Sequence, residues 1–144
     1  MCMAVYIASD SPLTLVPWNE ADPQFYVADL DGDGSAVRRH FAEAHVYYAG
    51  SHEGCGCGFQ YGQYPEIEDE DRPRKRDSLN RFADYLDRET ANVGTVHVFA
   101  CWEGDQTAPP EHRRKLAPED LRRDDFFFLE HELTTIEGKP TASD

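Results

Sequence analysis

The chain has 144 residues, of which 40% are hydrophobic and 12% aromatic, and its formal net charge is −14 at pH 7. This length and apolar content are typical of one globular domain that needs neither disulfides nor a structural metal to fold. The negative charge excludes nucleic acid and anionic membranes as expected partners and leaves a small-molecule or protein partner unspecified. The longest apolar run, residues 1–8, is far shorter than the ~20 residues that span a bilayer. We therefore expect a soluble, cytoplasmic protein whose thiols stay reduced.

The first third of the chain is rich in strand signals. The expected strands span residues 2–8, 24–30 and 45–50, with a short optional one at 13–16. Ser35 can cap a short helix over 36–43, in which Val37 and Phe41 share the inner face. The strand at 45–50 leads directly into a loop rich in glycine and cysteine.

The middle of the chain combines a charged segment with the clearest helix. Residues 58–76 carry an acidic block followed by a basic one, and we expect a mobile loop there. Asp77 is a good N-cap for an amphipathic helix that reaches about residue 90. Its periodicity predicts that Leu86 faces the core and that Glu89 lies on the opposite face. By this phase, Leu86→Asp destabilises the domain and Glu89→Ala has almost no effect.

The last third contains the most regular strand pattern. The side chains of residues 95–102 should point alternately to the two faces of a strand, with Val96 on one face and Cys101 on the other. Residues 107–114 read as a loop, and Pro118 begins a helical turn. A long final strand is expected over 125–137, and residues 138–144 form a tail that we expect to be disordered.

These elements predict a single domain, residues 1–137, of the α/β or α+β class. We expect a mixed sheet of about five strands with two main helices. Residues 45–102 read as strand, crossover helix and strand, so the two strands should run parallel with a right-handed connection. The loop after Gly50 and the strand end near Cys101 then lie at the same edge of the sheet, where α/β sheets often bind ligands.

The loop at 50–58 contains the best candidate site. His52, Cys55 and Cys57 offer an imidazole and two thiols within six residues, and these are the ligand types that zinc prefers. Gly56 allows the backbone to turn both sulfur atoms inward. Cys101 is the expected fourth ligand, so the predicted metal set is His52, Cys55, Cys57 and Cys101. Cys2 can join this set only if the first strand runs antiparallel to the parallel pair, or if the sheet curls.

Two other interpretations of the loop remain open at this point. The cysteines can act as reactive thiols if a neighbouring group lowers their pKa. Alternatively they are small buried side chains, and the protein is a non-catalytic acidic interaction module in which the loop is structural. The sequence does not decide whether the protein is an enzyme.

Overall fold

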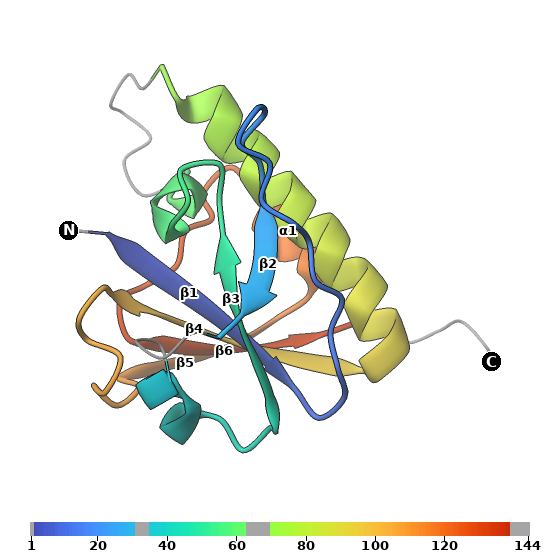
Figure 1. Cartoon of the computed structure of the whole chain (residues 1–144), viewed down its shortest axis with the longest axis vertical. Helices are drawn as coiled ribbons and strands as arrows, with labels where there is room; N and C mark the ends of the chain where they lie inside the picture. Colours follow the sequence, from blue (N-terminus) through green and yellow to red (C-terminus); the bar gives the residue numbers. More distant parts are fainter. Residues whose placement is uncertain (1, 31–34, 63–69, 139–144) are drawn as a thin grey trace.

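Six strands form one mixed sheet in the part of the chain that the computed structural model describes, residues 2–30, 35–62 and 70–138 (Figure 1). The strands are β1 (Met3–Ser9), β2 (Tyr26–Asp29), β3 (His45–Gly50), β4 (Thr95–Trp102), β5 (His112–Leu116) and β6 (Glu132–Glu137). The helices are α1 (Arg72–Val93) and three short 3-10 helices, η1 (Ser35–His40), η2 (Gly56–Phe59) and η3 (Pro118–Arg122). The strand order is β2-β3-β1-β4-β6-β5, and every neighbouring pair is antiparallel except β5 and β6.

β1 occupies the centre of this order. It pairs antiparallel with β3 on one side and with β4 on the other, so that Val5 lies between Ala49 and Ala100. β3 and β4 therefore run in the same direction and α1 connects them, as predicted for residues 45–102, but β1 is inserted between the two strands. The start of β1 consequently lies beside the C-terminal ends of β3 and β4.

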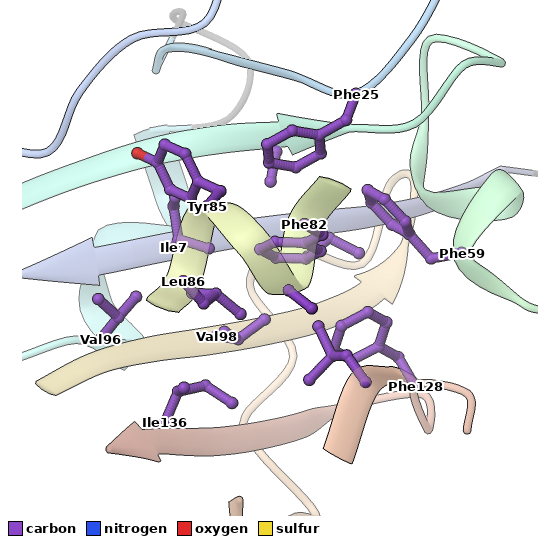
Figure 2. Close-up of a cluster of buried hydrophobic side chains, with 14 of the residues drawn as sticks. Ile7, Phe25, Phe59, Phe82, Tyr85, Leu86, Val96, Val98, Phe128 and Ile136 are labelled. Carbon is purple, nitrogen blue, oxygen red and sulfur yellow. The ribbon is translucent and has the colours of Figure 1, made fainter. Parts of the chain in front are cut away.

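The main core lies between the sheet and α1. Phe82 of α1 is fully buried at its centre, and its ring centroid lies 5.0 Å from those of Phe25 and Phe59 and 6.0 Å from that of Phe128 (Figure 2). Strand residues at alternate positions, such as Val98, complete this core from the sheet. A second, smaller core on the other face of the sheet contains Ala4, Tyr6, Phe99 and Cys101, together with Val37 and Phe41 from the region of η1.

The prediction of two main helices is wrong. The segment expected to form a helix over 36–43 forms the 3-10 helix η1 instead, which still buries Val37 completely. η1 has only six residues, and 3-10 geometry is common in short pieces. α1 begins at Arg72 rather than after Asp77, so part of the expected mobile loop, 58–76, is helical. Residues 63–69 of that loop lie outside the described residues.

The C-terminal strands also differ from the prediction. β5 falls partly in the expected loop at 107–114. The prediction missed this strand because its residues, HRRKL, lack the apolar alternation of a strand. Charged side chains of this kind are typical of a strand at the edge of a sheet. The expected strand over 125–137 is shorter, and Phe126 and Phe128 pack into the core from a loop. The expected tail, 138–144, lies outside the described residues except for Gly138.

None of the helices in the described part of the chain has the length and apolar character needed to cross a membrane.

The predicted phase of α1 is right for Leu86 and wrong for Glu89. Leu86 is fully buried, and Glu89 is only 4% exposed. The two positions are three residues apart, which places them on the same side of a helix. The carboxylate of Glu89 accepts hydrogen bonds from the backbone N–H of Thr14 at 2.7 Å and from its hydroxyl at 3.2 Å. Glu89 therefore fastens the segment before β2 to the helix.

We predict that Leu86→Asp and Glu89→Ala both lower the free energy of unfolding. Leu86→Asp should cost at least about 3 kcal/mol, because it places an unpaired charge in the core. Glu89→Ala should cost about 1–3 kcal/mol, because the N–H of Thr14 loses its acceptor. Urea denaturation followed by circular dichroism measures both, with the exposed change Asn92→Asp as a control of about 0.5 kcal/mol or less. A silent Glu89→Ala would contradict the placement of α1.

Candidate functional site

The loop that follows β3 is held in place by Ser51. The Ser51 hydroxyl donates to the carbonyl oxygen of Cys55 at 2.5 Å and accepts from the backbone N–H groups of Glu53 and Gly58 at 3.2 and 3.1 Å. The Ser51 backbone N–H also donates to the Cys55 carbonyl at 2.9 Å. Ser51 is fully buried. The sequence analysis missed this residue, because a serine next to a glycine carries no distinctive signal without its partners.

Two glycines allow the loop to pack closely against itself and against β1. A Cβ atom at Gly58 would lie 2.2 Å from the Ser51 hydroxyl oxygen. A Cβ atom at Gly56 would lie 2.8 Å from a methyl group of Val5 and 3.0 Å from the carbonyl oxygen of Met3. Neither position has space for a larger residue. Their close approach explains why glycines flank Cys57.

Three cysteines meet where this loop contacts the start of β1. The sulfur atoms of Cys2, Cys55 and Cys57 all lie within 4.8 Å of one another. The backbone N–H of Met3 donates to the sulfur atom of Cys57 at 3.2 Å. Cys2 is exposed, whereas Cys55 and Cys57 are half-buried. In Figure 1, the green turn η2, which contains Cys57, lies beside the start of β1.

Cys2 lies beside the loop because one condition stated for it, an antiparallel first strand, is met. β1 runs antiparallel to both β3 and β4, so its first residues lie at the edge where those two strands end. The backbone N–H of Glu103, just after β4, donates to the carbonyl oxygen of Cys2 at 2.7 Å. This bond extends the β1–β4 pairing to Cys2 and fixes its backbone beside the loop.

The structure places Cys101 away from the other cysteines. Cys101 lies near the expected edge of the sheet, where it pairs with Ala4. Its side chain is fully buried in the smaller core, whereas Cys57 packs against the main core on the helix side. Successive residues of a strand point to opposite faces, and the sequence does not show which face the loop covers. Of the four predicted ligands, only Cys55 and Cys57 come together.

His52 is also turned away from the cysteines. Its ring nitrogen Nδ1 lies 2.7 Å from the Ser78 hydroxyl oxygen, and Nε2 lies 2.8 Å from a carboxylate oxygen of Asp71. Ser78 belongs to α1, and Asp71 immediately precedes it. His52 thus connects the loop to the beginning of α1. Its donor atoms group with those of Glu53 and Asp71 rather than with the sulfur atoms.

Burial sets the proton affinity of two of the four thiols. Burial raises the pKa of Cys55 to about 12; a backbone hydrogen bond from Cys57 opposes this rise, and the thiol hydrogen bonds with Cys57 and Cys2 add to it. Burial likewise raises the pKa of Cys101 to about 12, and the nearby carboxylates of Glu103 and Asp105 add to the rise. Both thiols are therefore protonated at neutral pH, which makes them poor nucleophiles.

Comparisons of the chain with protein-family models, with curated proteins and with solved structures gave no match. The chemistry of the site itself is therefore the basis for a function.

We predict that the four cysteines of the metal-free protein differ in their reaction with a thiol reagent. Cys2 should be alkylated first because it is exposed, and Cys101 should stay unmodified until the protein unfolds because it is buried. Timed alkylation with iodoacetamide followed by peptide mass spectrometry measures each site separately. Rapid native labelling of Cys101 would contradict its position in the smaller core.

Proposed function

We propose that Cys2, Cys55 and Cys57 bind a soft metal ion of the zinc type. The observation that carries this proposal is the convergence of three sulfur atoms within 4.8 Å of one another. Two of them come from one loop and the third from the start of β1, more than fifty residues away in sequence. Thiolate ligands bind zinc and monovalent copper in preference to harder metal ions.

The spacing of the sulfur atoms suits a shared ion. Zinc–sulfur bonds of about 2.3 Å in a tetrahedron place two sulfur ligands about 3.8 Å apart. Sulfur atoms within 4.8 Å reach that spacing by small side-chain rotations. Three thiolates leave the fourth position of a tetrahedral ion for water, a small molecule or a residue of a partner protein. The exposure of Cys2 places the centre at the protein surface, where such a ligand can approach.

A backbone hydrogen bond orients the sulfur atom of Cys57 as a ligand. The N–H group of Met3 points its partial positive charge at the Cys57 sulfur atom from 3.2 Å. Hydrogen bonds to ligand atoms orient them and spread the negative charge that three thiolates bring together. The bonds from Ser51 fix the loop before any ion arrives, so little conformational entropy is lost on binding.

A redox function for these thiols has less support. A reactive cysteine needs a lowered pKa, and the pKa of Cys55 is raised instead. A metal ion overcomes a raised pKa because it displaces the proton. The other alternative, an acidic interaction module with a purely structural loop, predicts that no metal binds.

The metal content of matched variants tests the proposal. We expect protein purified without a histidine tag and loaded with zinc to hold about one ion per chain by elemental analysis. Cys2→Ser, and the double change Cys55→Ser with Cys57→Ser, should each lose bound zinc while circular dichroism shows that the fold survives. Cys101→Ala is the matched control and should keep its zinc. Wild-type protein that holds far less than one ion, or a Cys2→Ser variant that binds as well as wild type, would contradict the proposal.

We also predict that zinc binding becomes weaker as the pH falls. The thiol of Cys55, with its pKa of about 12, carries a proton at neutral pH, and zinc must displace it. For each proton displaced, the affinity should drop about tenfold per unit of pH. Calorimetry in buffers of different ionisation enthalpy measures the number of protons released. An affinity that does not change between about pH 6 and pH 8 would be inconsistent with thiolate ligation.

A further inference from the structure

A second group of metal-ligand side chains lies where the same loop meets the beginning of α1. His52, Glu53 and Asp71 each offer one donor atom, and these atoms lie within 4.8 Å of one another. The His52 nitrogen Nε2 is 2.8 Å from the Asp71 carboxylate. None of the three residues belongs to the cysteine cluster. The beginning of α1 therefore carries a separate set of donors, one imidazole and two carboxylates.

The ring of His52 is already oriented as a metal ligand would be. Its side chain is only 5% exposed, and Nδ1 lies 2.7 Å from the hydroxyl oxygen of Ser78. The same hydroxyl oxygen accepts the backbone N–H of His52 at 3.2 Å. Histidine ligands in metal sites usually donate their second ring N–H to such a partner, which fixes the ring and the tautomer. The Asp71 carboxylate at 2.8 Å can only accept, so Nε2 donates its proton there in the metal-free protein, and a metal ion bound at Nε2 would take the place of that proton.

Of the three donors, His52 borders an opening to the surface. A cavity of about 230 Å³ opens beside His52, and Asp22, Asp77 and Arg74 contribute to its wall. Two carboxylates and one guanidinium leave this wall with a negative balance. A hydrated cation can therefore approach the donors of the loop through a polar opening.

We propose that His52, Glu53 and Asp71 bind a divalent first-row transition metal ion, independently of the cysteine centre. Two carboxylates balance the charge of such an ion, and the imidazole favours a transition metal over calcium. Three protein ligands leave coordination positions free for water on the side of the cavity. This centre is harder than the cysteine centre, so one loop would hold two sites of different ion preference. The inference goes beyond the proposed function, and neither depends on the other.

Manganese is the probe that separates the two sites, because it binds poorly to thiolates and well to carboxylates. We expect wild-type protein to remove about one equivalent of Mn²⁺ from solution, measured by the electron paramagnetic resonance signal of the free ion. Asp71→Asn and Glu53→Gln should each weaken this binding about tenfold or more. Glu53 is exposed, so its variant should fold normally.

Two controls make the result specific. Asp77→Asn removes the same charge from the wall of the cavity without removing a ligand, and Cys55→Ser with Cys57→Ser removes only sulfur. Both should bind Mn²⁺ within about twofold of wild type, which would support the inference. Absence of Mn²⁺ binding to wild type would overturn it, and so would equal weakening by Asp77→Asn and Asp71→Asn, since general attraction by acidic groups would then explain the binding. Loss of zinc from the cysteine variants has no bearing on this outcome.

Discussion

β1 pairs antiparallel with β3 on one of its sides and with β4 on the other. Through this pairing, all seven residues of β1 are buried, and each face of the sheet receives part of its core from them. The same pairing places the first residues of β1 beside the loop that follows β3. Without an antiparallel β1, Cys2 would lie at the far end of the sheet, and the loop would contribute only two thiols.

The loop after β3 adds local rigidity to this arrangement. Ser51 bonds to three backbone groups of the loop, and Gly56 and Gly58 let it pack directly onto β1 and onto itself. Its two ends face different neighbours. Cys55 and Cys57 lie against the start of β1, whereas His52 lies against the start of α1. A single short loop therefore presents sulfur donors to one side and nitrogen and oxygen donors to the other.

Much of the fold could be predicted from local patterns. The alternation in β4 separates Val98 from Cys101 as expected, and the apolar spacing of α1 correctly places Leu86 in the core. Features that depend on distant partners could not be predicted. Glu89 is buried because Thr14, far away in the chain, supplies its hydrogen-bond donors. β5 forms because β6 offers a free edge, which its own basic residues do not indicate.

In the candidate site, too, local features could be predicted and features that depend on distant partners could not. The sequence located the loop and its two cysteines, because soft ligands close together on a glycine-rich backbone are a chemical signal in themselves. Tertiary packing decided the rest: β1 brings Cys2 rather than Cys101 to the loop, and His52 lies against Asp71 at the start of α1. The alternation along β4 shows that neighbouring side chains face opposite sides of the sheet. It does not show which side the loop covers, because that depends on tertiary packing.

X-ray absorption at the zinc edge counts the sulfur neighbours of a bound ion, and it therefore shows whether Cys2 completes a three-sulfur centre with the loop. For the zinc-loaded protein we expect three sulfur neighbours at about 2.3 Å and one lighter atom. In the Cys2→Ser variant, any zinc that remains bound should have no more than the two sulfur neighbours of the loop. A first shell composed mainly of nitrogen and oxygen, or three sulfur neighbours that persist without Cys2, would contradict the proposed three-sulfur centre.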